Sequence, residues 1–187
     1  MRTLTEIATT YPTDKLHKHG YIPVYDRIMS PNRETVKNVL EIGIYGGDSL
    51  RTWQEFFPNA TIYGIDIDKS TFIEGERIKC MYGNQSSVED LNRLRAHFIK
   101  EGVKFDYIVD DGSHTWSDQI LSFLMFKDLL TDEGKYFIED VYVTNVEETV
   151  EYAYKPIMEN FKDFALEVYD GREELGLHDE VMLILGR

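Results

Sequence analysis

The sequence predicts a single α/β domain with a mostly parallel seven-stranded sheet, an antiparallel C-terminal edge hairpin and helices on both faces. Three observations predict it. Short apolar runs alternate with amphipathic stretches of ten to fifteen residues, which is typical of crossover units and a parallel sheet. The runs are continuously apolar, so both faces of the sheet should be covered. The last two runs have no helical pattern between them and should pair antiparallel.

The chain has 187 residues, which fits one domain, 1–187. Residues 1–35 precede the first strand and contain one short helical pattern at 21–29. We expect them to form a helical cap over the active-site end of the sheet, with the Rossmann-like core at 36–187. The first five strands are expected at 36–44, 60–68, 77–82, 105–111 and 135–141.

Three helices should connect these strands, at 49–57, 87–102 and 117–130. Ser86 and Glu89 have the spacing of a capping box at the start of the second, and Gly102 follows its end. Gly134 should stop the third.

A fourth helix is expected over 146–161, where Asn145 can cap its start and Pro156 should kink or end it. The closing strands are expected at 163–170 and 181–186, joined by a charged loop.

Composition excludes several classes of partner. The formal net charge is −14 and the pI is about 4.7, so the surface should repel nucleic acid. No apolar stretch is long enough to cross a bilayer, and the N-terminus lacks an apolar signal core. Cys80 is the single cysteine, so no internal disulfide can form. A cytoplasmic location is the default expectation.

Ligands of open α/β sheets bind beyond the carboxyl ends of the strands. Nearly every expected strand ends in an acid or an amide, which core packing does not explain. The segments concerned are 41–47, 66–68, 83–86, 110–114 and 139–140.

The glycine-rich turn after the first strand predicts half of a nucleoside site. Glycine allows a ligand to approach the backbone, and Asp66 after the second strand could accept both ribose hydroxyls. The turn lacks the third glycine of the dinucleotide fingerprint, and Glu41 suits a cationic ligand better than a pyrophosphate. These details favour S-adenosyl-L-methionine, held by Glu41, Gly43, Tyr45, Gly46 and Asp66.

Less functional interpretations stay open here. Glu41 could cap amides of the turn, and Asp66 could be a cap or turn residue. Asn84, Gln85 and Ser86, after the third strand, could hold an adenine edge, although Ser86 is also a good helix cap.

Asp110 and Asp111 follow the fourth strand, and Glu139 and Asp140 follow the fifth. These four carboxylates should meet at one edge of the sheet, because the two strands are plausible neighbours. Crowded carboxylates repel one another unless a cation joins them. We therefore expect Asp111, Glu139 and Asp140 to bind Mg²⁺ or Mn²⁺. Glu139 and Asp140 can face one ion only if the strand has ended and the backbone turns. Asp110 should face the cofactor or neighbouring backbone; the alternative for all four is solvated strand ends and helix caps.

His114 follows Asp111 by three residues. A metal lowers the pKa of an alcohol oxygen and an imidazole can take its proton near neutral pH. His114 is the expected general base, with Asp111 beside it, although most loop histidines are ordinary surface residues.

Several motifs in register resemble those of metal-dependent sugar O-methyltransferases, the macrocin, mycinamicin and rhamnosyl enzymes. They are "TDKLHKHGY", "LEIGIYGGDSLRTW", "YGIDIDKS", "GNQSS", "FDYIVDDGSH" and "YFIEDV", between about residues 13 and 141. The resemblance implies the class I methyltransferase fold, S-adenosyl-L-methionine, Mg²⁺ and a sugar or glycan acceptor such as rhamnose.

By the same resemblance, Thr13, Lys15, His19 and Tyr21 should lie near the methyl donor and acceptor, although Tyr21 could equally be a packing residue. Trp116 could stack on a sugar ring or anchor its loop. Asp118 stands where relatives often have a second histidine, which puts a shared acceptor contact in doubt.

Two other functions remain in view. A catechol-type phenolic O-methyltransferase has the same fold and metal, but a lysine usually serves as its base, whereas "DDGSH" supplies a histidine. A non-catalytic nucleotide-binding module is the other alternative. The sequence leaves a homodimer open.

Overall fold

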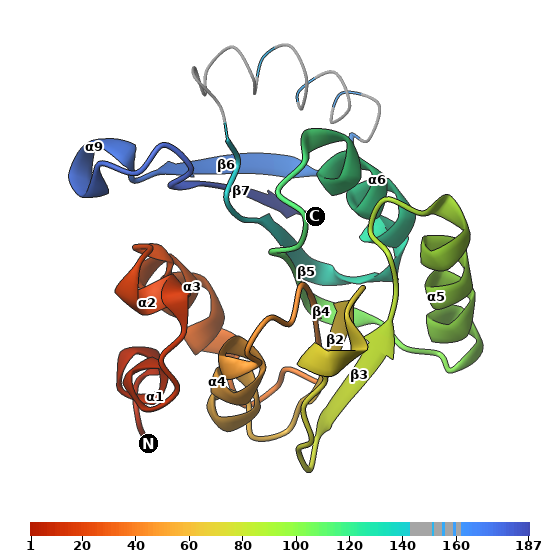
Figure 1. Ribbon diagram of the computed structural model, residues 1–187, viewed down its shortest axis with the longest axis horizontal. Coiled ribbons are helices and arrows are strands. Elements are labelled where there is room, and N and C mark those ends of the chain that lie inside the picture. The colour runs from red at the N-terminus through yellow and green to blue at the C-terminus, as the bar shows by residue number, and fades with distance from the viewer. Residues whose placement is uncertain (143–150, 152–154, 156–158, 160–161) are drawn as a thin grey trace.

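The protein was analysed as a computed structural model that describes residues 1–142, 151, 155, 159 and 162–187. Its centre is a seven-stranded sheet with the strand order β3-β2-β1-β4-β5-β7-β6 (Figure 1). The strands are β1 (Asn38–Ile42), β2 (Thr61–Asp66), β3 (Ile78–Tyr82), β4 (Phe105–Asp110), β5 (Leu130–Ile138), β6 (Ala165–Asp170) and β7 (Val181–Gly186).

The order confirms the predicted fold class. The first five strands are parallel, and β7 pairs antiparallel with both β5 and β6. β7 therefore lies between β5 and β6, and β6 forms the edge. A four-residue helix, α9 (Arg172–Leu175), stands in the loop that was expected to contain no helix.

Helices cover both faces of the sheet. The N-terminal helices and α4 (Asp48–Phe56) lie on one side, and α5 (Val88–Lys100) and α6 (Trp116–Phe126) lie on the other (Figure 1). Short 3₁₀ turns occur at Ser30–Asn32, Lys69–Thr71 and Lys127–Leu129. The helices are α1 (Leu4–Thr10), α2 (Asp14–His17), α3 (Tyr21–Met29), α4 (Asp48–Phe56), α5 (Val88–Lys100) and α6 (Trp116–Phe126).

Two hydrophobic cores result, because successive strand residues point to opposite faces. Val39 and Val109 join Trp53 of α4 in the first core, whereas Leu40 and Ile108 belong to the second core with α5 and α6. The central strands thus have two buried faces, as their continuously apolar runs predict.

The predicted cap of α5 is off by one residue. The N-cap is Ser87, whose hydroxyl accepts a hydrogen bond from the amide of Asp90 at 3.2 Å. The hydroxyl of Ser86 instead donates to the carboxylate of Asp118 at 2.6 Å. Gly102 follows the helix with a φ of +67°, as expected of a C-terminal glycine.

The predicted boundary between α6 and β5 is also wrong. The α-helix ends at Phe126, and β5 already begins at Leu130, so Gly134 lies inside the strand. Leu130 pairs with Phe105 across an irregularity in the β4–β5 register, and this pairing overrides the helical pattern of the sequence.

The helix predicted at 146–161 lies outside the described residues. Within the described part of the chain, no helix combines the length and apolarity needed to cross a membrane.

Candidate active site

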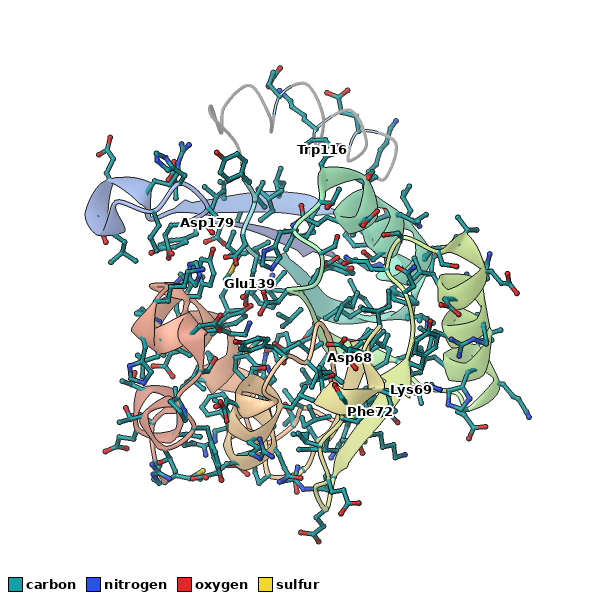
Figure 2. The ribbon with its side chains drawn as sticks, in the orientation of Figure 1. Asp68, Lys69, Phe72, Trp116, Glu139 and Asp179 are labelled. Atoms are coloured by element: carbon teal, nitrogen blue, oxygen red, sulfur yellow. The ribbon has the colours of Figure 1, made fainter. Side chains whose placement is uncertain are left out.

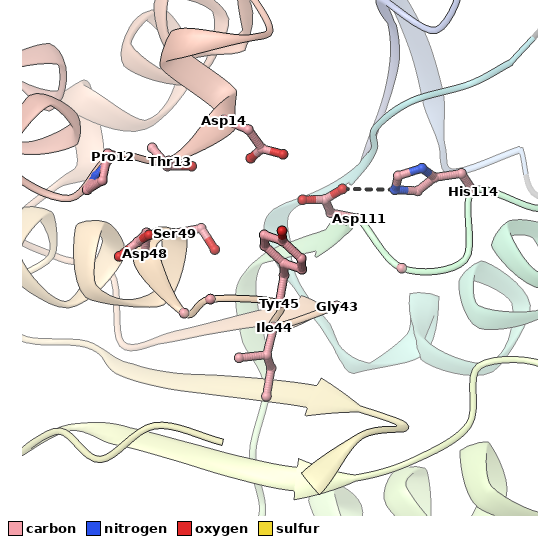
Figure 3. Close-up of a pocket in the computed structure, with 13 residues that line it drawn as sticks. Pro12, Thr13, Asp14, Gly43, Ile44, Tyr45, Asp48, Ser49, Asp111 and His114 are labelled. Carbon is pink, nitrogen blue, oxygen red and sulfur yellow. Dashed lines mark hydrogen bonds and ion pairs between the residues drawn. The ribbon is translucent and has the colours of Figure 1, made fainter. Parts of the chain in front are cut away.

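Two cavities open at the carboxyl ends of the parallel strands, where ligands of α/β sheets bind. The larger, about 280 Å³, lies between the N-terminal segment, the glycine-rich turn and the loop after β4 (Figure 3). The second, about 220 Å³, lies over the ends of β1, β2 and β3 and shares Gly43 and Gly112 with the first. The two cavities therefore lie side by side at the carboxyl ends of the central strands.

The glycine-rich turn lines the larger cavity and requires its first glycine. Gly43 has a φ of +94°, and a Cβ atom there would stand 2.1 Å from the carbonyl oxygen of Asp111. Ile44 packs into the core, whereas Tyr45 has a φ of +47° and is 92% exposed. The turn therefore presents backbone and an aromatic ring to the cavity, and the expected contact of Gly43, Tyr45 and Gly46 with the cofactor stays a prediction.

Asp66 shapes this turn as well as facing the second cavity. Its Oδ2 accepts a hydrogen bond from the amide of Ile44 at 2.8 Å, and its Oδ1 accepts one from Asp68 at 2.8 Å. The turn role that the sequence left open is thus present. Asp66 still lines the second cavity, where a ribose could reach it.

Asn84, Gln85 and Ser86 all line the second cavity. Gln85 is buried, and its side chain joins the loop after β3 to the end of β4. Its Oε1 accepts a hydrogen bond from the amide of Ser113 at 2.9 Å, and its Nε2 donates one to Asp110 at 2.6 Å. Asn84 accepts from the amide of Ser86 at 2.9 Å.

Asp110 is buried within protein rather than on the cavity wall. It accepts hydrogen bonds from Gln85, from Ser122 at 2.7 Å and from Tyr136 at 3.2 Å. Burial raises the pKa of its carboxyl to about 7, and these hydrogen bonds only partly oppose that effect. Asp110 lines neither cavity, and it accepts hydrogen bonds from three side chains and from the backbone of Gly112, so its expected contact with the cofactor stays a prediction.

Lys15 lies at the centre of a buried acid cluster. Its Nζ lies 2.5 Å from Asp111, 2.7 Å from Glu139 and 3.2 Å from Glu41. Burial alone would lower the pKa of the ammonium, but the three carboxylates raise it well above its usual value. Glu41 also accepts a hydrogen bond from the Trp53 indole at 2.9 Å, so it forms the floor beneath the cavities and lines neither.

His114 joins Asp111 to Asp140. Its Nε2 lies 3.1 Å from Oδ1 of Asp111, and its Nδ1 lies 3.6 Å from Oδ2 of Asp140. The hydrogen bond that the imidazole donates to Asp111 raises the pKa of His114, against its partial burial, and the nearby acids add to this rise. Figure 3 shows the Asp111–His114 contact at the mouth of the larger cavity.

The backbone takes a positive φ at Asp140 and at His114. Such a turn after the end of β5 is the condition for the adjacent side chains of Glu139 and Asp140 to face one ion. β5 ends at Ile138, and Asp140 has a φ of +50°. His114 has a φ of +53°. Positive φ at non-glycine residues is uncommon and persists where surrounding contacts enforce it.

A hard cation fits this donor set. One ligand atom each from Asp111, His114 and Asp140 lie within 4.8 Å of one another, and the buried Lys15 ammonium shows that the adjoining acids already enclose a positive charge. Glu139 points elsewhere, toward Lys15 and the hydroxyl of Tyr25, which donates to it. The three predicted metal ligands are thus neighbours, but Glu139 needs a side-chain rearrangement to share an ion with Asp140.

The N-terminal segment brings further predicted residues to the rim. Thr13 caps α2 and lines the larger cavity. Tyr21 donates to Asp140 at 2.8 Å and stacks on His19, with ring centroids 5.0 Å apart. Tyr21 therefore both packs and positions a carboxylate.

Trp116 and Asp118 begin α6 beside the loop that carries His114. Trp116 packs against the second core, lines neither cavity and lies near the top of Figure 2. Asp118 accepts hydrogen bonds from Ser86 at 2.6 Å and from Ser113 at 2.8 Å. It joins the loops after β3 and β4.

Sequence reasoning missed Glu180 and Tyr25. Glu180 is fully buried and accepts from His19 Nδ1 at 2.6 Å and from the Gly20 amide at 2.7 Å, which anchors the N-terminal segment to the start of β7. An acid directly before a fully apolar strand was the available signal. Tyr25 lies in an amphipathic helix and carried no such signal.

The chain is similar in sequence to several sugar O-methyltransferases. No protein-family model matches the chain. Mycinamicin VI 2''-O-methyltransferase of Micromonospora griseorubida and demethylmacrocin O-methyltransferase of Streptomyces fradiae are each 35% identical over 147 residues, 74% of this chain and 36% of each relative. An 8-demethyl-8-alpha-L-rhamnosyl tetracenomycin-C 2'-O-methyltransferase of Streptomyces olivaceus is 32% identical over 146 residues, 74% of this chain and 37% of that relative. The chain thus spans little more than a third of the length of these relatives.

Solved methyltransferase structures are similar to this chain in fold. The MycE methyltransferase of the mycinamycin pathway, in complex with Mg, SAH and mycinamycin VI, matches with a TM-score of 0.79 at 26% identity, over 99% of this chain and 54% of that chain. The SAH-bound methyltransferase PaMTH1 of Podospora anserina matches with a TM-score of 0.58 at 15% identity, over 100% of this chain and 88% of that chain, which supports the fold alone.

Proposed function

We propose, because the chain belongs to the sugar O-methyltransferase family of these relatives, that it transfers a methyl group from S-adenosyl-L-methionine to a sugar hydroxyl with the help of Mg²⁺ or Mn²⁺. The acceptor is a rhamnose-like deoxysugar or a glycan that carries one. The observation that carries the proposal is the placement of the Asp111–His114–Asp140 cluster at the mouth of a cavity lined by the glycine-rich turn.

The two cavities provide the cofactor site. The nucleoside half would lie over β2 and β3, where Asp66 can accept from the ribose hydroxyls and Asn84 and Ser86 can contact the adenine edge. The methionine half would lie in the larger cavity, between Gly43 and Thr13. The buried negative charge of Glu41 and Asp111 beside that cavity favours a cationic sulfonium.

Asp111 and Asp140 would hold the metal, with Glu139 as a further ligand after rearrangement. Bound there, the ion supplies Lewis-acid chemistry that lowers the pKa of a hydroxyl oxygen. All-oxygen carboxylate donors suit Mg²⁺ and Mn²⁺.

His114 would act as the general base through Nδ1. Its Nε2 can donate to Oδ1 of Asp111 at 3.1 Å, which fixes the tautomer and leaves the Nδ1 lone pair free to accept a proton. Nδ1 lies 3.6 Å from Asp140, too far for a hydrogen bond.

Methyl transfer then needs only the donor, the acceptor hydroxyl and a base. The acceptor oxygen forms a bond to the methyl carbon while the carbon–sulfur bond breaks and its electron pair stays on sulfur. The hydroxyl proton passes to Nδ1 of His114. The chain contributes mainly by orienting donor and acceptor in contact, since methyl transfer needs no covalent intermediate.

The test is methyl transfer from labelled S-adenosyl-L-methionine, in Mg²⁺, to rhamnose-, fucose- and viosamine-type glycosides, with catechols as the control acceptors. We expect labelled methyl ethers of a sugar. Product from catechols alone would identify a phenolic O-methyltransferase. Cofactor binding without turnover on any acceptor would instead support a nucleotide-binding module.

A further inference from the structure

The ammonium of Lys15 occupies the inner side of the acid cluster. The residue is 1% exposed, and its Nζ contacts Oδ2 of Asp111 at 2.5 Å and Oε2 of Glu139 at 2.7 Å. These are two of the three carboxylates expected to bind the metal. The lysine is placed by Thr13, which caps the short helix α2 and accepts from the Lys15 amide.

The same oxygens cannot serve the ammonium and a divalent ion equally well. A carboxylate held at 2.5–2.7 Å by one cation has a second cation within a few ångströms when it also binds a metal, and like charges at such separations repel strongly at low dielectric. Of the two carboxylates that contact Lys15, Glu139 is the less available to a metal ion. Its other oxygen, Oε1, accepts a hydrogen bond from the hydroxyl of Tyr25, so both oxygens of Glu139 already have partners.

We propose that Lys15 is a resident cation that competes with the divalent ion for Asp111 and Glu139. This inference rests on the proposed metal dependence. In the metal-free protein, the single positive charge of Lys15 partly offsets the charge of Glu41, Asp111 and Glu139. It weakens the metal site, and it leaves Oδ1 of Asp111 and the carboxylate of Asp140 as the more readily available metal ligands.

The test measures Mn²⁺ binding directly, by calorimetry and by the electron paramagnetic resonance signal of free Mn²⁺, without methyl donor or acceptor. The proteins are the wild type, Lys15→Met and the double variant Lys15→Met/Glu41→Gln. The double variant removes one buried cation and one buried anion together, so the net charge of the cluster is unchanged. Lys100→Met, on the exposed end of α5, is the control.

We expect both Lys15 variants to bind Mn²⁺ at least about tenfold more tightly than the wild type, and Lys100→Met to bind equally well. Lys15→Met buries uncompensated acids and could unfold without metal, in which case the double variant decides the question.

A folded double variant that binds Mn²⁺ no more tightly than a metal-binding wild type would overturn this inference and leave the proposed function standing. If neither the wild type nor any variant binds Mn²⁺, the proposed metal dependence fails, and the inference fails with it.

Discussion

Asp111 divides its carboxylate between two partners, with Oδ1 at 3.1 Å from the imidazole of His114 and Oδ2 at 2.5 Å from the ammonium of Lys15. The lysine and the histidine contact lower the pKa of the Asp111 carboxyl to about 2, against the effect of its burial. The carboxylate is therefore ionised at neutral pH. It can orient the imidazole permanently, which makes His114 the side chain to test first.

His114→Asn should lower kcat by about 10²- to 10⁴-fold, the usual contribution of a general base, while binding of S-adenosylhomocysteine stays within a few-fold of wild type. Asparagine is the right replacement because it tolerates the φ of +53° at this position better than alanine does. Steady-state methyl transfer and calorimetry measure the two quantities.

Thr115→Ala, on the same loop, is the matched control and should retain wild-type turnover. Full activity of His114→Asn would remove the histidine from the mechanism.

Removal of metal should abolish methyl transfer, and Asp140→Asn should weaken metal binding. Asparagine again suits the backbone, here with a φ of +50°, and it can keep the contact with the Tyr21 hydroxyl. It lacks the negative charge, so we expect at least about a tenfold weaker Mn²⁺ affinity and a matching rise in the Mg²⁺ concentration that activity requires.

Chelator followed by Mg²⁺ should restore wild-type turnover. Asp132→Asn, at a fully exposed position in β5, controls for loss of one acidic charge. Turnover that persists in excess chelator would contradict the carboxylate site.

The sheet was predictable because its strands are short, apolar and separated by clear helical patterns. The antiparallel position of β7 followed from the missing crossover helix. The start of β5 was not predictable, since Leu130 continues a helical pattern and only its pairing with Phe105 makes it extended. Ser86 and Ser87 show the same limit: either could cap α5, and the contact of Ser86 with Asp118 decides which one does.

The rim residues were predictable from their positions after strands, but their partners were not. Nothing local in the sequence links Lys15 to Glu139, which lies 124 residues away, or His19 to Glu180, 161 residues away. Such pairs depend on how the N-terminal helices dock on the sheet. The interpretation of Asp111, Glu139 and Asp140 as one ligand set therefore stays a prediction.

Gly43→Ala should destabilise the protein, whereas Gly46→Ala should not. The first places a Cβ atom 2.1 Å from the backbone oxygen of Asp111 and forces a φ of +94°, while the second meets its nearest neighbour, the flexible end of Asp48, at 3.6 Å. We expect Gly43→Ala to lower the free energy of unfolding by roughly 2 kcal/mol or more. Urea unfolding of both variants provides the measurement, and equal stabilities would refute the close approach of the two strand ends.

Asp110 should make the protein less stable as the pH rises. Its pKa in the folded state is about 7, raised by burial from an ordinary value near 3.8, so the folded state retains a proton that the unfolded state releases. The resulting stability is complete below about pH 4 and is lost as the pH rises to about 7, with a total on the order of 4 kcal/mol.

Asp110→Asn should remove this dependence, because a neutral amide can keep the contacts with Gln85 and Ser122 without a charge to bury. The variant should therefore gain stability relative to wild type between pH 5 and pH 8, measured by urea unfolding at each pH. Taking the difference between the two proteins cancels the titration of unaffected groups. A constant difference across that range would mean that Asp110 is ionised throughout, held by the three hydrogen bonds that it accepts from Gln85, Ser122 and Tyr136.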